Sequence, residues 1–559
     1  MSGRAIWLGI GAVGAVFIAV LLFSSLASED TTATGELQSV VLHRGNTAEP
    51  STLDPHKASG TWESRIVNDL FEGLYTYAPD ATPTLGVATG HTVSDDGLIY
   101  TFTLREDARW SDGTPITAYD FEYSFRRMVN PETVADLASY YYVVENGREI
   151  NVGEIDDLSQ LGARALDDHT FEVRLNQPEP SFIQLTTRYP FHPVPRHVID
   201  VHGDDWSTPG TMVTNGPYVL EQWVPNDFIH SVRNPNYYDT ANVPIDEVYY
   251  YPTDDASAAL RRFRAGELDL NTDYPEQQHD WLMDNLPNAT RTTPSICVGY
   301  ISANIEAAPT SDVRVRQALN MSINREMLSE RVLGLGEAPA TSVVTPFAPN
   351  YQSPEPDWVS LSFPERQDRA RALLAEAGYD ETNPLRFVYR YRESIKNRRA
   401  AIAIANMWEE IGAEVELVNT EVAVHYADIQ VGDFQIADAG WCAFVVQAER
   451  LLALSHTYIG IFNYSNYYGE EFEAIFDEAV QIADVEARSA LLAEAEMILQ
   501  RDVPIIPTYY YVDKNLVGVH VQGWVNNPGN VHLTRYLSID EDLRPVQVGF
   551  WERVFGASN

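Results

Sequence analysis

The sequence predicts an α/β fold divided into several domains. Its 559 residues are too many for one hydrophobic core, and this length suggests about three or four domains. Hydrophobic residues make up 45% and aromatic residues 11% of the chain, which is enough to build ordered cores. Segments with strand periodicity also alternate with segments of helical periodicity. These three observations favour a globular protein of mixed strands and helices.

In the first half of the chain most of the predicted elements are strands. Alternating polar and apolar residues predict them over 37–45, 167–177, 215–223 and 247–255. A helix is expected over 65–77, ending near Gly73. The remaining elements are a strand, turn and helix over 100–128 with Thr117 as N-cap, and a helix from Ala259 that stops at Gly266 before a short strand.

In the second half, helices and strands alternate more regularly. Apolar residues at helical spacing predict helices over 312–323, 365–379, 398–412 and 486–502. Strands are expected over 386–391, 413–419 and 507–513. No repeat of fixed period interrupts this order, so the second half is predicted to be an α/β lobe.

The charge of the chain excludes some partners. Lys and Arg number 38 against 80 Asp and Glu, which gives a formal net charge of −42. Such a surface repels phosphate backbones and anionic lipid heads, so we expect no nucleic acid partner. The charge alone fits a soluble acidic surface, and a face that selects cationic ligands is the alternative.

The N-terminus predicts export. Arg4 precedes an apolar run from Ala5 to Phe23, and Ser25-Leu26-Ala27 fits a small-x-small cleavage site. Residues 1–27 are therefore predicted to be a signal peptide, and 28–36 a linker. The run is almost long enough to span a bilayer, so an uncleaved N-terminal anchor is the alternative. An exported chain with two cysteines, Cys297 and Cys442, is a candidate for one disulfide, with two buried free thiols as the alternative.

Motifs for catalysis and for cofactors are missing from the sequence. There is no H-E-x-x-H and no G-x-S-x-G, and the 13 histidines are scattered. The Gly-Leu-Gly at 334–336 lacks the rest of a phosphate loop and is expected to end a helix. We therefore predict no enzyme activity, no cofactor and no metal.

Three tyrosine runs, at 140–142, 249–251 and 509–511, are the positive signal for binding. Tyrosine offers apolar surface and one hydroxyl at low entropic cost. In a strand, neighbouring members of a run face opposite ways, so one face could pack a core while the other lines a cleft. Core packing alone is the alternative.

Eight blocks of sequence follow one another between about Leu37 and Ile539: LDPHKASGTWES, DLFEGLY, LREDARWSDGTPITAYDF, TNGPYVLEQW, RRFRAGELDL, DVRVRQALNMSINRE, LLAEAGY and AGWCA. In this order they resemble the periplasmic oligopeptide-binding proteins of ABC importers. The resemblance implies an α/β, two-lobed periplasmic binding-protein fold with an extra domain, which makes three domains with a hinge between the lobes. Domain I is expected from 37–71, 195–296 and 512–559, domain II from 72–194, and domain III from 297–511.

The resemblance also implies a ligand site. In the family an extended peptide lies between the lobes and pairs its main chain with the protein. A disulfide between Cys297 and Cys442 would support a strand that contacts the ligand. The implied ligand-binding residues are Ser59, Thr61, Trp62, Tyr140, Asn215, Asp438, Gly440, Trp441, Cys442, Phe444, Tyr509, Tyr510 and Tyr511.

This sequence departs from the family pattern at the site. Phe444 stands where the family has an Asp that pairs with the ligand's amino terminus, Asp438 stands where an Arg is typical, and Asn397 aligns with a family His. A buried amine needs a counter-charge, so either Asp438 or Glu449 replaces the lost Asp, or the ligand is not a free-amine peptide. We expect Asp438 to be the replacement anchor and basic ligands to be preferred. The alternative is that Asp438 pairs with a neighbouring arginine such as Arg398.

The predicted function is that of a periplasmic, monomeric receptor that binds extended oligopeptides or peptide-like solutes. It would deliver them to an ABC permease and its ATPase. The alternative is a ligand sensor or chaperone-like interaction protein on the same fold, held by an uncleaved N-terminal helix.

Overall fold

The computed structural model describes residues 39–443 and 445–544. The predicted signal peptide or anchor, the linker and Phe444 lie outside the described residues. Within the described ranges, no helix is both long and apolar enough to cross a membrane.

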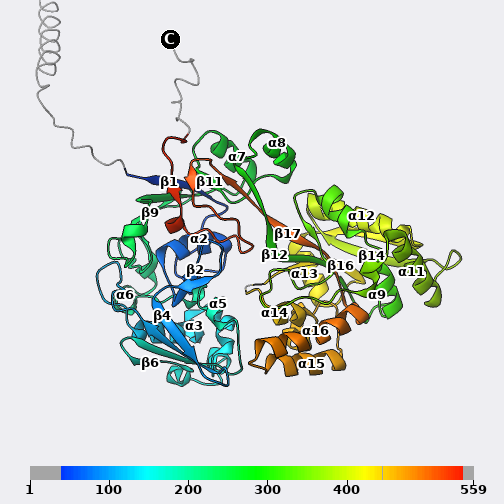
Figure 1. The fold of residues 1–559 in the computed structure, drawn as a ribbon, viewed down its shortest axis with the longest axis horizontal. Coiled ribbons are helices and arrows are strands. Elements are labelled where there is room, and N and C mark those ends of the chain that lie inside the picture. Colours follow the sequence, from blue (N-terminus) through cyan, green and yellow to red (C-terminus); the bar gives the residue numbers. More distant parts are fainter. Residues whose placement is uncertain (1–38, 444, 545–559) are drawn as a thin grey trace, which may run out of the picture. The chain divides into compact units, whose positions relative to one another are not determined.

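The largest sheet has eleven strands in the order β15-β14-β16-β12-β17-β11-β1-β10-β9-β8, with β13 paired to β17 (Figure 1). Its strands, in chain order, are β1 Val41–Asn46, β8 Tyr218–Val224, β9 Phe228–Arg233, β10 Glu247–Pro252, β11 Leu270–Asn271, β12 Thr290–Ala303, β13 Ala338–Pro339, β14 Leu385–Arg392, β15 Ala413–Thr420, β16 Ile436–Cys442 and β17 Ile505–Val517.

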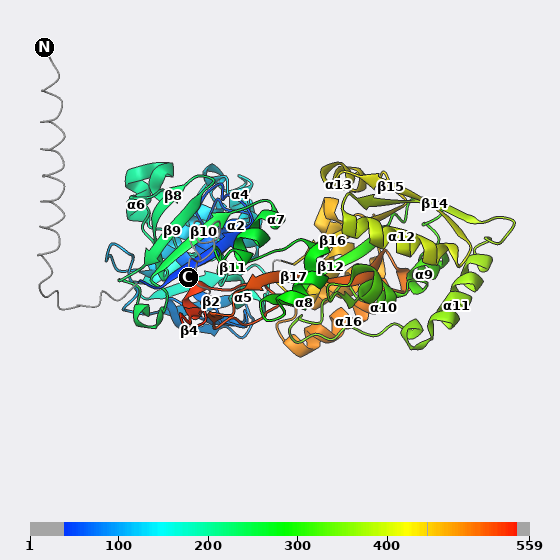
Figure 2. The ribbon, with the colours of Figure 1, turned by 90° about the horizontal axis from the view of Figure 1, so that it is seen from above.

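Two long antiparallel strands, β12 and β17, join the two halves of this sheet. β17 pairs with β11 on one side, and β12 pairs with β16 further along (Figures 1 and 2). The pairing of β12 with β17 is interrupted between Pro294 and Val298. Pro294 has no N–H to donate, which weakens the ladder at this point. The expected boundaries between domains I and III, at 296/297 and 511/512, fall at this interruption, and they stay a prediction.

A second, antiparallel sheet has the order β4-β5-β7-β6. Its strands are β4 Ala88–Val93, β5 Ile99–Leu104, β6 Ala163–Asp167 and β7 Thr170–Arg174. Helix α3, Ala118–Val129, packs on it through Phe121 and Phe125, whose rings contact Phe171 of β7. All three rings are fully buried. The sheet lies within the segment predicted as domain II. Two antiparallel two-stranded sheets complete the strands: β2 Tyr75–Tyr77 with β3 Pro83–Leu85, and β18 Val521–Gln522 with β19 Ser538–Ile539.

The remaining α-helices lie between these strands along the chain. They are α2 Thr61–Leu70, α4 Gly147–Asn151, α5 Phe182–Leu185, α6 Arg196–His202, α7 Ala256–Arg264, α8 His279–Asn285, α9 Val313–Met321, α10 Arg325–Met327, α11 Phe363–Glu376, α12 Ile395–Glu409, α13 Val422–Gln430, α14 Ala448–Leu452, α15 Glu470–Val480 and α16 Val485–Asp502.

The half of the large sheet that contains β14, β16, β12 and β17 separates two hydrophobic cores. Val298, Ala437 and Tyr510 pack with residues of α15 and α16 in one core. Ile301, Ile436 and Tyr509 belong to the other core, with residues of α9, α11 and α12. Tyr509 and Tyr510 therefore contribute to different cores, as expected for neighbours in a strand.

The tyrosine run at 140–142 does not follow this pattern. These residues lie in a 3₁₀ segment, Ala138–Val143, and not in a strand. Tyr141 is fully buried, and its hydroxyl donates to the carbonyl oxygen of Pro190 at 2.9 Å. Face alternation therefore does not apply to this run.

Most predicted helices are found with small shifts of their ends, but the first differs. The helix expected over 65–77 begins at Thr61 and ends at Leu70, and Tyr75–Tyr77 forms β2. The early start follows from Glu63, whose carboxylate accepts from the amide of Gly60 at 2.8 Å. Gly334 ends a helical stretch, Leu328–Leu333, in the left-handed conformation, as expected for the Gly-Leu-Gly segment.

Thr117 is the N-cap of α3, as predicted. Its amide donates to the Asp120 carboxylate at 2.8 Å, and its hydroxyl lies 3.1 Å from the same oxygen. We expect Thr117→Ala to lower the free energy of unfolding by about 1 kcal/mol, because the first turn loses its cap. Thr117→Ser keeps the hydroxyl and should behave like the unmodified protein in thermal unfolding. Equal melting temperatures for all three proteins would contradict this prediction.

Candidate ligand-binding site

The predicted disulfide is present. Cys297 in β12 and Cys442 in β16 are direct partners in the antiparallel pairing, and their sulfur atoms are bonded. The alternative of two free thiols is therefore wrong. The bridge fixes the end of β16 against β12, and so holds Trp441 and Ile296, the neighbours of the two cysteines, on adjacent strands.

Asp438 in β16 is bound within the protein. Its carboxylate accepts from the backbone amide of Arg392 at 2.7 Å and from Arg392 Nε at 2.9 Å. Only 8% of Asp438 is exposed. Burial opposes the charge on Arg392, but Asp438 outweighs it and raises the pKa of this guanidinium. The ion pair with Arg392 compensates the charge of Asp438, and a role of Asp438 as the ligand anchor stays a prediction. The partner is Arg392 and not Arg398.

This ion pair leads to a test of Asp438. Asp438→Asn should lower the free energy of unfolding by about 2 kcal/mol, because charge-assisted hydrogen bonds to Arg392 are lost. The matched control is Asp433→Asn, just before β16. The side chain of Asp433 is 74% exposed and 3.5 Å from Arg390, so its loss should cost less than about 1 kcal/mol. Urea denaturation compares the two variants. Equal stability losses would show that Arg392 does not depend on Asp438.

Small residues leave room for tyrosine rings beside Asp438. A Cβ added to Gly440 would collide with the hydroxyl of Tyr511, and one added to Gly299 would lie 2.9 Å from the ring of Tyr509. The rings of Tyr509 and Tyr511 are 5.4 Å apart. The indole of Trp441, which is half-buried, meets Phe462 edge to face at 5.5 Å. The structure therefore brings Gly440, Tyr509 and Tyr511 together, whereas the side chain of Tyr510 packs into the core on the other side of the sheet.

The predicted residues from the first part of the chain lie in several places. Ser59 and Thr61 are exposed at the start of α2, Trp62 follows them half-buried, and Tyr140 is half-buried in its 3₁₀ segment. Asn215 is buried, and its side chain is bound to the backbone of Glu72. Asn215 Oδ1 accepts from the Glu72 amide at 3.0 Å, and Nδ2 donates to the Glu72 carbonyl at 2.7 Å. These contacts give Asn215 a supporting role in the fold.

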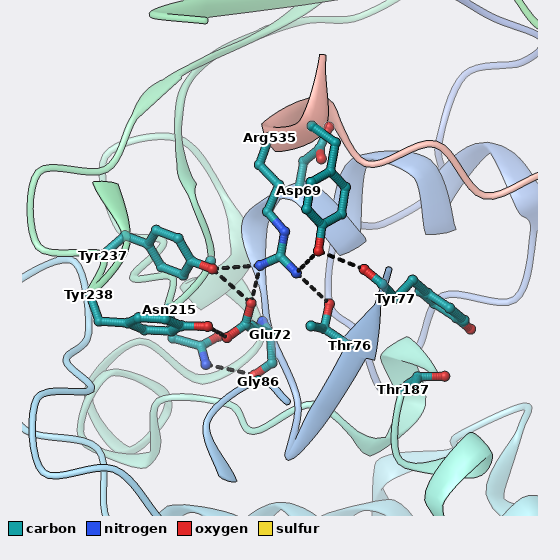
Figure 3. A network of polar contacts seen from close by, with 12 residues as sticks. Asp69, Glu72, Thr76, Tyr77, Gly86, Thr187, Asn215, Tyr237, Tyr238 and Arg535 are labelled. Carbon is teal, nitrogen blue, oxygen red and sulfur yellow. Dashed lines mark hydrogen bonds and ion pairs between the residues drawn. The ribbon is translucent and has the colours of Figure 1, made fainter. Parts of the chain in front are cut away.

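Glu72 also binds Arg535 in a polar network (Figure 3). The Glu72 carboxylate accepts from the hydroxyls of Tyr237 at 2.8 Å and Tyr238 at 2.6 Å. Arg535 further donates to Thr76 Oγ1 at 3.2 Å. Burial opposes the charge on Arg535, while Glu72 raises its pKa. The network attaches the chain segment around Arg535 to β2 and to the segment that precedes it.

A cavity of about 400 Å³ is the candidate ligand site. One part of its wall comes from the predicted domain II, from residues 77–83 and 180–188. Another part comes from the predicted domain III, from 347–351, 446–449 and 485–492. Ile296 and residues 528–531 complete it. Ile296 precedes Cys297, so the disulfide lies directly beside the wall. No described member of the predicted ligand-binding set lines this cavity, and their contact with a ligand stays a prediction.

An ion pair and a hydrogen bond join the two parts of the cavity wall. Arg450 donates to Glu179 at 2.6 Å, and Arg488 donates to the carbonyl of Pro178 at 3.1 Å. Within the second part, Arg488 also donates to Glu449 at 2.7 Å. Burial raises the pKa of the Glu449 carboxyl, and Arg488 counteracts this rise. Like Asp438, Glu449 is thus already paired with an arginine.

Sequence reasoning missed most of the residues of this wall. Phe347 lies in the stretch Thr-Pro-Phe-Ala-Pro, where a large aromatic residue between prolines on a loop is a local signal for binding. Ile183 and Arg488 carry no such signal, because they lie in helical segments with ordinary apolar spacing.

Two long strands, β12 and β17, join the halves of a mixed sheet. A cavity is lined by segments from the first and the second half of the chain. This arrangement is that of a solute-binding receptor. The chain belongs to the bacterial extracellular solute-binding proteins of family 5, whose middle-region model matches residues 82–458. It is therefore a solute-binding protein and not an enzyme.

Individual relatives agree with this assignment over most of the chain. The periplasmic oligopeptide-binding protein OppA of Salmonella typhimurium is 37% identical over 516 residues, covering 91% of this chain and 94% of OppA. The unliganded open form of the murein tripeptide-binding protein MppA matches with a TM-score of 0.82 at 33% identity, covering 90% of this chain and 98% of MppA.

Haemophilus influenzae OppA, in complex with the peptide RPPGFSPFR, matches with a TM-score of 0.72 at 31% identity and covers 90% of this chain and 99% of that one. The expected periplasmic binding-protein fold is confirmed. Like these relatives, the chain is a periplasmic protein.

Proposed function

We propose that this protein is the receptor of an ABC peptide importer. It binds an extended oligopeptide in the cavity and delivers it to a membrane permease and its ATPase, acting as a monomer. The cavity of about 400 Å³ carries this proposal, because its wall is built from both the 72–194 and the 297–511 segments. A ligand that contacts both walls stabilises them against each other, which a receptor needs in order to signal that it is loaded.

The interruption between β12 and β17 supports a hinge at this point. Pairing is regular from Thr290 to Pro294, and a second register shift follows between Gly299 and Tyr300, so two irregularities lie close together where the halves of the large sheet meet. A few residues at the end of an element suffice to absorb such a rotation. We infer that domains I and III meet here and that closure on a peptide bends both strands.

Peptide contacts are proposed on two sides. The residues concerned lie outside the cavity wall, so they would meet the part of an extended peptide that reaches beyond the cavity. Trp441 and Cys442, at the end of β16, offer backbone groups to such a ligand, and Tyr511 lies beside Gly440 of the same strand. Ser59, Thr61, Trp62 and Tyr140 would meet the ligand from the other side.

Calorimetry on the purified chain tests the proposed function. Protein purified without refolding should carry a co-purified ligand of peptide mass in native mass spectrometry. After unfolding and refolding to remove it, the protein should bind peptides of two to five residues at a stoichiometry of one. A refolded protein with native circular dichroism that binds no peptide in the panel would refute the proposal.

A further inference from the structure

Among the described residues that line the cavity, positive and negative charges are equal in number. Four charged residues line it within the described ranges: Asp80, Arg188, Glu449 and Arg488. Two are anions and two are cations, and Glu449 is paired directly with Arg488 at 2.7 Å. The chain as a whole carries a formal charge of −42, so the cavity does not share the acidic surplus of the surface. A ligand charge therefore gains no net attraction from this wall, while it loses its hydration on entry.

Large apolar side chains make up much of the rest of the wall. Phe347 is 39% exposed, and its side chain lines the cavity. Ile183 of α5 and Ile296 of β12 are half-buried and face the same cavity. They come from three separate segments, so the apolar surface surrounds the space from more than one side. Such surface is stabilised when an apolar group displaces water from it.

The supports of this surface are ordered. The amide of Ile296 donates to the carbonyl of Pro528 at 3.2 Å, and the disulfide follows it at Cys297. The loop of Phe347 is held by Ser489, whose hydroxyl donates to the carbonyl of Asn350 at 2.7 Å, and by Tyr351, which binds Glu496. A wall fixed in this way loses little conformational entropy when a ligand binds.

We infer that the cavity selects a bulky apolar side chain of the bound peptide. This inference rests on the proposed function and names its substrate class: peptides that carry a large aliphatic or aromatic residue, in preference to basic or acidic ones. The pairing of Asp438 with Arg392 and of Glu449 with Arg488 removes the two anions that would have favoured basic ligands. Phe347 is the main specificity-determining residue, with Ile183 and Ile296 on the facing walls.

A series of alanine pentapeptides tests the inference by calorimetry. The central residue is Ala, Leu, Phe, Lys or Asp. The Leu and Phe peptides should bind at least about tenfold more tightly than the Lys and Asp peptides, because burial of such a side chain exceeds the free energy of one factor of ten. Phe347→Ala should remove most of the advantage of the Phe peptide over the Ala peptide, and leave the Ala peptide within about twofold of its original affinity.

Two further variants complete the design. Tyr119→Ala removes an aromatic side chain that is 53% exposed on α3 and lies outside this cavity, so it should change no affinity. Ile183→Ala replaces Phe347→Ala if circular dichroism shows that the latter does not fold, and it should reduce the same preference. The inference is overturned if the Lys peptide binds as tightly as the Phe peptide, or if Phe347→Ala weakens all peptides equally. If no peptide binds, the proposed function fails and the inference with it.

Discussion

Replacing Arg535 by methionine is expected to lower the free energy of unfolding by about 3–5 kcal/mol. The side chain of Arg535 is 9% exposed and that of Glu72 is 2% exposed, and the two form an ion pair. Without the guanidinium, the Glu72 carboxylate stays buried with only the hydroxyls of Tyr237 and Tyr238 as side-chain partners. An uncompensated buried charge is the costly element of this change.

Denaturation with urea measures the effect, and two further variants control it. Arg501→Met removes an arginine that is 54% exposed in its pairs with Glu471 and Asp502, and should cost less than about 1 kcal/mol. The double variant Glu72→Gln with Arg535→Met removes both charges and should recover part of the lost stability. If Arg535→Met is no less stable than Arg501→Met, the network of Figure 3 does not hold this region together.

Loss of the disulfide is the second large effect. Cys297 and Cys442 are 145 residues apart in sequence, and cross-linking so long a loop removes much of the entropy of the unfolded chain. Replacing both cysteines by serine should lower the free energy of unfolding by up to about 5 kcal/mol. A reductant should lower the free energy of unfolding of the natural protein by a similar amount, and this appears as a lower unfolding midpoint.

The double serine variant is also the control for the reductant. It has no bond to reduce, so the reductant should leave its midpoint unchanged. Thiol titration of the denatured, unreduced natural protein should find no free thiol. Two reactive thiols, or a midpoint that is insensitive to reductant, would contradict the bonded state.

Local patterns in the sequence were enough to predict the local structure. Capping chemistry located Thr117 at the start of α3, and apolar spacing predicted α9, α11, α12 and α16. The same reasoning predicted that neighbouring tyrosines in all three runs face opposite ways. This alternation is found for Tyr509 and Tyr510, which lie in opposite cores, and it does not apply to Tyr141 in a 3₁₀ segment. The lining of a cleft by these runs stays a prediction. Periodicity within three residues does not distinguish a strand from a tight helical turn.

The electrostatics of the site could not be predicted, because the partners are distant in sequence. Asp438 is neutralised by Arg392, 46 positions earlier, and Glu449 by Arg488, 39 positions later. Arg535 reaches Glu72 across 463 positions. A count of the charges near Trp441 in the sequence predicted a negative cleft. Such a count leaves out the partners on neighbouring strands and helices. The fold class could be predicted, because resemblance along nearly the whole chain fixes the topology that brings these partners together.

A crystal structure of the protein with a bound peptide tests the receptor assignment most directly. We predict peptide density in the cavity, with contacts to residues 180–188 on one wall and to 446–449 on the other, and with the bulky apolar residue of the peptide against Phe347. Density for the peptide at another surface, with this cavity empty at a saturating concentration, would contradict the assignment of the site and of the function built on it.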